Sequence, residues 1–187
     1  MKQRPAGAAL VLAVLLTAPA VILPAGCGGE PATQPPSQGS GTVAPGRDKV
    51  ELVKVVDGDT IWVRMPDGSK ERVRYIGIDT PEIAHTDAPA EYMGEEASIR
   101  NAELLALGPL YLELDVDERD DFGRLLAYVW AGEVFVNERL VRDGYARAQD
   151  YPPNLARQSQ LREAQREARA GGLGLWAPAR TTTPTGS

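Results

Sequence analysis

The sequence predicts an α+β domain, mainly β, in which a five-stranded Greek-key barrel carries three helices. Three observations favour this fold class. Five short segments have strand patterns, one helical segment stands before the fourth of them, and two helical segments follow the fifth. This order fits a five-stranded barrel of the OB type. The chain of 187 residues has room for one such domain with a tail at each end.

The five predicted strands are β-branched or alternate between apolar and polar side chains. They are residues 50–56, 60–65, 71–78, 110–116 and 125–130. Between the second and third of these segments, Pro66 and Gly68 stand at the second and fourth positions of a type I turn. We therefore expect these two strands to form a hairpin.

The three predicted helices have apolar residues at helical spacing and end at glycine or proline. They are residues 91–107, 136–143 and 154–170, which stop at Gly108-Pro109, Gly144 and Gly171-Gly172. In the first of them, Ala97, Leu104 and Leu105 share one face. That face should pack against the barrel.

The N-terminal segment has the order of a signal peptide. A basic start precedes an apolar run over residues 8–22 and a set of small residues, so residues 1–26 are predicted to direct export. Cys27 follows a segment that resembles the lipobox of bacterial lipoproteins, and we expect it to be lipidated. The chain would then be a membrane lipoprotein facing outward, anchored through its N-terminus, or alternatively a secreted protein.

Composition sets the other boundaries of the domain. Residues 27–47 are rich in proline, glycine and serine and poor in large apolar side chains, which predicts a flexible linker. The folded domain is expected over residues 48–176. Residues 177–187 resemble the linker in composition and are predicted to be disordered.

Charge and rare residues exclude several kinds of site. The formal charge is −6, and loss of residues 1–26 removes 2 of the 20 basic side chains, which leaves 18 against 26 acidic ones, or −8. Such a chain should bind a polyanion weakly unless its arginines converge or a metal ion intervenes. One cysteine cannot form an internal disulfide, and one histidine cannot supply a zinc cluster of imidazoles.

Two acidic loops supply hard oxygen ligands. Asp59 lies in the loop 56–60 after the first predicted strand, and Asp79 lies at the end of the third. If the barrel brings them together, both carboxylates could hold Ca²⁺ with the carbonyl oxygen of Thr80 and waters. Each motif taken alone is also a common turn former.

Three further residues suit the hydrolysis of a phosphodiester, which needs positive charge over the phosphate and an activated water. Glu82 could accept a proton from a water near the metal. Arg74 and Arg124 could bind phosphate oxygens as negative charge develops. The alternatives are a helix N-terminal charge for Glu82 and surface ion pairs for both arginines.

Three motifs of this chain resemble those of the staphylococcal nuclease (thermonuclease) family in sequence, order and spacing. They are residues 56–60 (VDGDT), 73–82 (VRYIGIDTPE) and 121–128 (DFGRLLAY). Segments 91–98, 136–144 and 174–176 extend the likeness over about residues 50–176. The resemblance implies an OB barrel with three helices and cleavage of DNA or RNA to 3′-phosphorylated products.

The resemblance also implies roles for the candidate residues. The positions matching Asp59, Asp79 and Thr80 bind calcium in that family. The position matching Glu82 is usually assigned as the general base, and those matching Arg74 and Arg124 stabilise the transition state at phosphorus.

The chain departs from the family near the bound nucleotide. Asp121 and Phe122 occupy positions where the archetype has lysine and tyrosine, so positive charge and a hydroxyl donor are lost. Tyr75 and Tyr151 are the candidate aromatic contacts to the substrate.

We therefore expect an exported, calcium-dependent nuclease that prefers single-stranded or unpaired regions and acts as a monomer without a protein partner. The main alternative is a non-catalytic OB module that binds nucleic acid or protein at the cell surface. A third interpretation is an envelope protein in which calcium is only structural, which predicts a calcium-dependent melting temperature without turnover.

Overall fold

The computed structural model describes residues 46–84 and 89–178. The predictions for the signal peptide, for lipidation at Cys27, for most of the linker and for residues 179–187 lie outside these ranges. Within the described part of the chain, no helix has the length and apolarity needed to cross a membrane.

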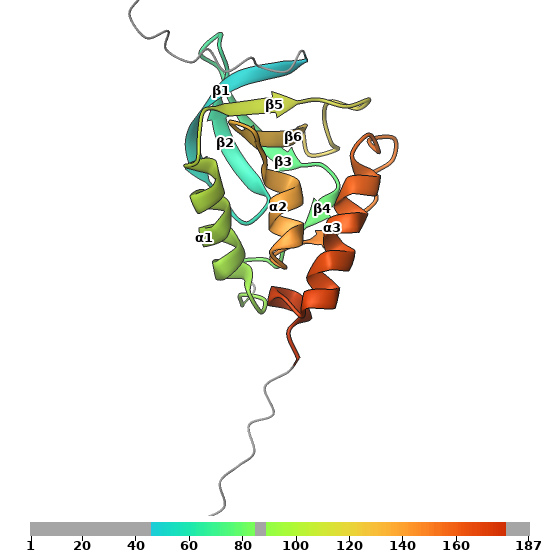
Figure 1. Ribbon diagram of the computed structural model, residues 1–187. Helices are drawn as coiled ribbons and strands as arrows, with labels where there is room; N and C mark the ends of the chain where they lie inside the picture. The colour runs from blue at the N-terminus through green and yellow to red at the C-terminus, as the bar shows by residue number, and fades with distance from the viewer. Residues whose placement is uncertain (1–45, 85–88, 179–187) are drawn as a thin grey trace, which may run out of the picture. The chain divides into compact units, whose positions relative to one another are not determined.

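A closed, five-stranded barrel forms one end of the domain, and the helices extend below it in the view of Figure 1. Its strands are β1 (Arg47–Val55), β2 (Thr60–Arg64), β3 (Lys70–Tyr75), β5 (Leu110–Glu113) and β6 (Leu125–Ala131). The strand order is β3-β2-β1-β5-β6, with antiparallel neighbours, and a parallel pairing of β3 with β6 closes the barrel. The predicted fold class is confirmed.

The predicted third strand is divided in two. β3 ends at Tyr75, and after a turn Ile78 and Asp79 form β4 (Ile78–Asp79), which pairs with β8 (Arg147–Ala148) instead of continuing in the barrel. Gly77 makes this turn with φ of +78°, a backbone conformation that glycine adopts without strain. The turn directs Asp79 out of the barrel wall. A further short strand, β7 (Val134–Phe135), extends the sheet beyond β6.

Three α-helices lie where the sequence predicts them; the second begins at its predicted residue, and the first and third begin later. They are α1 (Gly94–Leu105), α2 (Val136–Arg142) and α3 (Gln158–Gly171), and a 3₁₀ turn follows at Gly174–Trp176. α1 begins late because Met93 has a left-handed backbone conformation, with φ of 70°. α3 begins four residues later than expected. Asn154, where the helix was predicted to start, is buried in the preceding turn, and its side chain exchanges hydrogen bonds with the backbone of Asp117.

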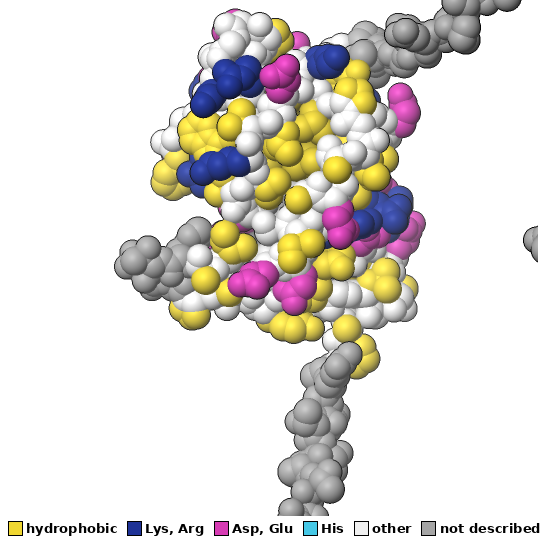
Figure 2. All heavy atoms as spheres, turned by 90° about the vertical axis from the view of Figure 1, so that its left-hand side faces the viewer, with side chains coloured by type: hydrophobic (Ala, Val, Ile, Leu, Met, Phe, Trp, Pro, Cys, Tyr) yellow, Lys and Arg dark blue, Asp and Glu magenta, His cyan; other side chains and the backbone are white. Residues whose placement is uncertain are grey.

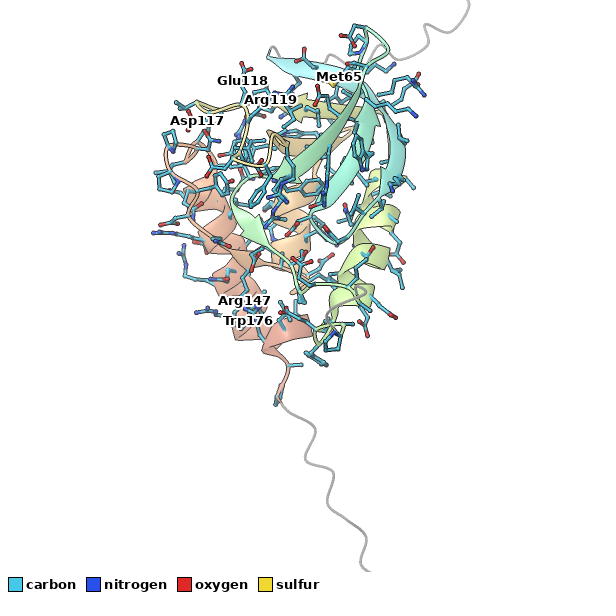
Figure 3. All side chains as sticks on the ribbon, turned by 180° about the vertical axis from the view of Figure 1, so that it is seen from behind. Met65, Asp117, Glu118, Arg119, Arg147 and Trp176 are labelled. Atoms are coloured by element: carbon cyan, nitrogen blue, oxygen red, sulfur yellow. The ribbon has the colours of Figure 1, made fainter. Side chains whose placement is uncertain are left out.

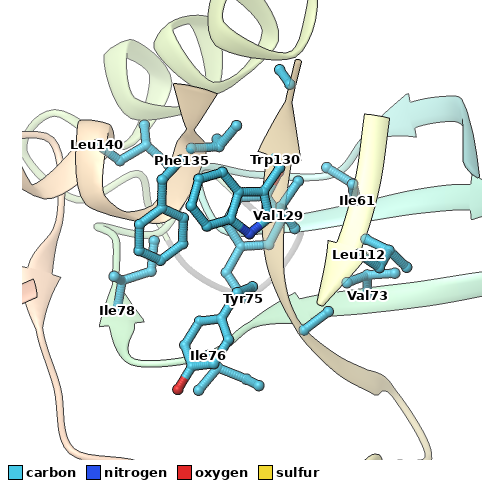
Figure 4. Packing of buried hydrophobic residues seen from close by; sticks show 14 of the residues in the cluster. Ile61, Val73, Tyr75, Ile76, Ile78, Leu112, Val129, Trp130, Phe135 and Leu140 are labelled. Atoms are coloured by element: carbon cyan, nitrogen blue, oxygen red, sulfur yellow. The ribbon is translucent and has the colours of Figure 1, made fainter. Parts of the chain in front are cut away.

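The core fills the barrel and the space between barrel and helices. Figure 4 shows Trp130 and Phe135 with their rings together, at a centroid distance of 4.6 Å, and Tyr75 among aliphatic side chains of β2, β3 and β6. Since β6 is buried at every position, its parallel contact with β3 lies entirely inside the domain.

One face of the domain carries charged side chains of both signs (Figure 2). On the face in Figure 2, lysine and arginine side chains lie in separate groups, with aspartate and glutamate between some of them. This face offers no continuous basic surface to a nucleic acid.

Candidate active site

The two predicted acidic loops are in direct contact. Asp59 is buried in the loop between β1 and β2, and its Oδ2 accepts hydrogen bonds from the backbone N and Oγ1 of Thr80, at 2.9 and 3.0 Å. A Cβ at Gly58 would lie only 2.6 Å from Thr80 Oγ1. Glycine is therefore required for this close approach.

Arg74 joins both acidic side chains. From the end of β3, its Nη1 forms an ion pair with Asp59, and its Nη2 lies 3.2 Å from Asp79 Oδ1. The Asp59 side chain is 7% exposed and that of Asp79 is 46% exposed. One arginine thus serves two carboxylates, one buried and one open to solvent, and we call Asp59, Arg74, Asp79 and Thr80 the acidic pocket.

The pKa values of both carboxyl groups are raised, chiefly by burial that the nearby positive charge offsets only in part. Burial raises the pKa of Asp59 above its usual value, and Arg74 offsets only part of that shift. Burial likewise raises the pKa of Asp79, opposed by Arg74 and, to a smaller extent, by Arg147. Both carboxylates would be stabilised by another cation in the pocket.

The donor set fits calcium. Carboxylate and carbonyl oxygens are ligands that Ca²⁺ prefers, and its flexible coordination allows waters to complete the set. Across residues 46–84 and 89–178, no group of three or more His, Cys, Asp or Glu side chains could hold a metal ion. A metal in the acidic pocket would therefore depend on Asp59, Asp79, a backbone carbonyl such as that of Thr80, and waters.

A buried hydrogen-bond chain supports the loop that carries Asp59. The Tyr75 hydroxyl donates to Asn101 Oδ1 at 2.9 Å, and Asn101 Nδ2 donates to the carbonyl oxygen of Asp57 at 3.1 Å. The Asp59 backbone N in turn donates to Asp57 Oδ1 at 3.0 Å. We call this Tyr75–Asn101–Asp57 set the loop support.

The loop support corrects one prediction and adds a residue that sequence reasoning missed. Tyr75 has no exposed surface, so it offers no face on which a base could stack, and its predicted substrate contact does not hold. Burial also raises the pKa of its hydroxyl, which stays a donor. Asn101 was missed, although a polar residue on the apolar side of a predicted helix could have indicated it.

Glu82 lies on the exposed segment that leaves the acidic pocket, three residues after Asp79. Its carbonyl oxygen accepts a hydrogen bond from Glu91 N at 2.9 Å and lies against Gly94, where a side chain would clash. The start of α1 therefore fixes the Glu82 backbone.

Arg124 stands just before β6, beside β3. The parallel register pairs Val73 with Leu125 and Arg74 with Leu126, so closure of the barrel brings Arg124 to the strand that carries Arg74. Figure 3 shows the loop before Arg124, with Asp117, Glu118 and Arg119, at the end of the molecule away from Arg147 and Trp176.

Asp120 holds Arg124 in place. Its Oδ2 accepts a hydrogen bond from Arg124 Nε at 2.6 Å, and its Oδ1 accepts from the backbone N of Arg124 and of Phe122. Burial opposes ionisation of Asp120, but these hydrogen bonds hold its pKa below the usual value. Neither terminal nitrogen of Arg124 has a hydrogen bond to a described residue, so both can bind an anion.

Of the remaining predicted contacts, Tyr151 is partly buried against the core, and Asn154 beside it is fully buried. The Asn154 side chain exchanges two hydrogen bonds of 2.8 Å with the backbone of Asp117. The structure therefore groups Asp59, Arg74, Asp79 and Thr80 by direct contact, with Glu82 and Arg124 on adjoining segments.

Comparison with known proteins identifies relatives of this chain. Residues 72–178 match the family described as staphylococcal nuclease homologue. The thermonuclease of Staphylococcus hyicus is 40% identical over 126 residues, which are 67% of this chain and 74% of that protein. The thermonuclease of Staphylococcus intermedius is 42% identical over 131 residues, 70% and 77% of the two chains. The endonuclease YncB of Bacillus subtilis is 42% identical over 139 residues, 73% and 65% of the two chains.

Proposed function

The chain belongs to the staphylococcal nuclease family and is a nuclease, and from this premise we propose that it hydrolyses phosphodiester bonds of DNA or RNA in a calcium-dependent reaction. The products would carry a 3′-phosphate. The observation that carries the proposal is the acidic pocket, where one arginine faces two carboxylates whose pKa values are both raised.

Asp59, Asp79 and the Thr80 carbonyl would hold the calcium ion, which when bound supplies positive charge to the scissile phosphate. Asp59 is fixed for this role by its bonds to Thr80, and its loop is fixed by the loop support. Asp79 keeps one side open to solvent, which leaves room for waters and substrate.

Both arginines would bind the phosphate, and different carboxylates hold each of them in place. Arg124, held through Nε by Asp120, can direct both terminal nitrogens at phosphate oxygens in a forked contact. Arg74, which contacts Asp59 and Asp79 through its two terminal nitrogens, could donate to a phosphate oxygen placed beside these carboxylates. Such fixed donors stabilise charge that develops in the transition state.

Glu82 would accept the proton of the attacking water. Its carboxylate is exposed and three residues from Asp79, and the contacts of α1 with its backbone limit its movement. A group positioned in this way can act as a general base.

The setting of this activity is also a proposal. The signal-like order of residues 1–26 supports export, and the lipobox-like segment before Cys27 supports a lipid anchor on the outer side of the cell membrane. A nuclease in that position would meet nucleic acid from outside the cell.

Digestion of labelled single-stranded DNA by the purified protein tests the proposal, with calcium, with excess chelator, and with Glu82→Gln. We expect cleavage only with calcium, at least about 100-fold slower in the variant. Phosphatase treatment should change the mobility of the products if their 3′ ends carry phosphate. Intact DNA under every condition, with a folded protein, would favour a non-catalytic binding module.

A further inference from the structure

A second group of side chains next to Arg124 has no assigned role. Arg72, Phe122 and Arg124 line a pocket of about 200 Å³ between β3 and the loop before β6. Because Val73 and Leu125 are paired and both buried, the residues that precede them point to the opposite, outer side of the barrel. Arg72 and Arg124 therefore lie side by side on one surface.

Arg72 is exposed, and its side chain makes no hydrogen bond or ion pair with any other described residue. Glu71, the adjacent carboxylate in the sequence, points to the other face of β3 and is engaged by Arg119 in two hydrogen bonds of 2.9 and 3.0 Å. Arg124 is balanced by Asp120. The pocket therefore carries the uncompensated positive charge of Arg72.

Phe122 supplies an aromatic face to the same pocket. Its side chain is 84% exposed, and the Arg124 guanidinium lies 5.4 Å from its ring centre. The loop that presents it is ordered, since the Phe122 backbone N donates to Asp120 and Gly123 makes the following turn with φ of +77°. An exposed aromatic ring on a fixed support can stack on a base without a large loss of conformational entropy.

We propose that Arg72 and Phe122 form a substrate subsite next to the scissile position. Arg72 binds the phosphate adjoining the one held by Arg124, and Phe122 stacks on a base of the same strand. This inference rests on the proposed function and defines the substrate as an unpaired strand with at least two consecutive phosphates. A base in a duplex could not reach Phe122 without leaving its stack.

The test compares two substrates with Arg72→Gln, Phe122→Leu and Phe122→Tyr. One substrate is an octathymidylate, and the other is a thymidine dinucleotide with a single phosphodiester. Arg166→Gln is the matched control, because it removes the same charge from an exposed position on α3. All variants should keep the wild-type melting temperature, since neither Arg72 nor Phe122 is buried.

For the octathymidylate, we expect Arg72→Gln and Phe122→Leu to raise KM about tenfold with little change in kcat. Phe122→Tyr, which keeps the ring, should behave like the wild type. The salt dependence of kcat/KM should become weaker for Arg72→Gln, with its log–log slope reduced by about 0.7. For the dinucleotide, all three variants should match Arg166→Gln.

Other results would overturn the subsite. If Arg72→Gln equals Arg166→Gln on both substrates, Arg72 binds no phosphate. If it slows the dinucleotide equally, Arg72 acts at the scissile phosphate instead. In both cases the nuclease remains established by wild-type cleavage, whereas a wild type that cleaves neither substrate with calcium would contradict the proposed function itself.

Discussion

The acidic pocket and the Asp120–Arg124 pair both place carboxylates against an arginine, yet the pKa shifts have opposite directions. Two carboxylates share Arg74, and burial raises the pKa of both. Asp120 has Arg124 to itself and three hydrogen bonds, so its pKa is lowered in spite of burial.

This difference separates two tasks. The acidic pocket lacks positive charge and is suited to take up a cation. The Asp120–Arg124 pair is balanced and leaves the terminal nitrogens of the arginine available, so it is suited to hold a donor in one orientation. The predictions below test this separation, since changes in one region should not alter the property assigned to the other.

The largest effect is expected for Arg124→Ala. Loss of one fixed donor to the transition state should lower kcat at least about 100-fold. Calcium affinity should not change, because Arg124 does not contact the acidic pocket. Steady-state kinetics and calcium titration by calorimetry measure the two quantities, with Arg166→Ala as control. Weaker calcium binding in Arg124→Ala would show that the two regions are not separate.

Calcium affinity should depend on pH. Calcium requires ionised ligands, so protons compete with it below the raised pKa values of Asp59 and Asp79. The calcium Kd should rise up to about tenfold per pH unit for each proton displaced, as pH falls to the raised pKa values of the two carboxyl groups and below them. Calorimetric calcium titrations at successively lower pH values measure this.

Without calcium the same groups act in the opposite sense on stability. A raised pKa in the folded state favours the protonated carboxyl, so their contribution to the free energy of unfolding is lost as pH rises. Asp59→Asn should abolish the calcium-induced rise in melting temperature, whereas Asp120→Asn should keep it. A calcium Kd independent of pH would contradict this account of the acidic pocket.

The sequence predicted the parts of the site that follow from chain order. Asp59 and Asp79 were both placed in acidic loops next to predicted strands, and in the structure these loops meet through Thr80 and Arg74. Arg74 could be placed on the third strand by alternation. Its contact with both carboxylates could not be predicted, because it depends on the turn at Gly77 that redirects the chain before Asp79.

Residues whose surroundings depend on how the barrel closes were harder to predict. Tyr75 was expected to contact substrate, but alternation along β3 cannot tell which side of a barrel wall faces the core. Arg72 was not recognised, because its proximity to Phe122 arises only from the parallel pairing of β3 with β6, which local sequence does not indicate.

A smaller effect is expected for Asp120→Asn. The amide keeps the shape of the side chain but removes the charge that fixes Arg124 Nε. We expect kcat to fall about tenfold or somewhat more, because a hydrogen bond to a charged group typically contributes about 1.5 kcal/mol or more. The pH profile of kcat tests this positioning role. Because the pKa of Asp120 is lowered in the folded protein, its carboxylate stays ionised and holds Arg124 until pH falls below the pKa that Asp120 has in the unfolded chain. An unchanged kcat would mean that Arg124 needs no such support.

The smallest effect on activity is expected for Tyr75→Phe, which removes only the hydroxyl at the end of the loop support. Asn101 Oδ1 loses its donor inside the core, so the free energy of unfolding should fall by about 1–2 kcal/mol. Asn101 still bonds to the Asp57 carbonyl, so the loop stays in place and kcat, KM and calcium Kd should match the wild type. Urea unfolding and kinetics on the octathymidylate separate the possibilities. A several-fold higher KM without loss of stability would mean that the hydroxyl meets the substrate, which its complete burial opposes.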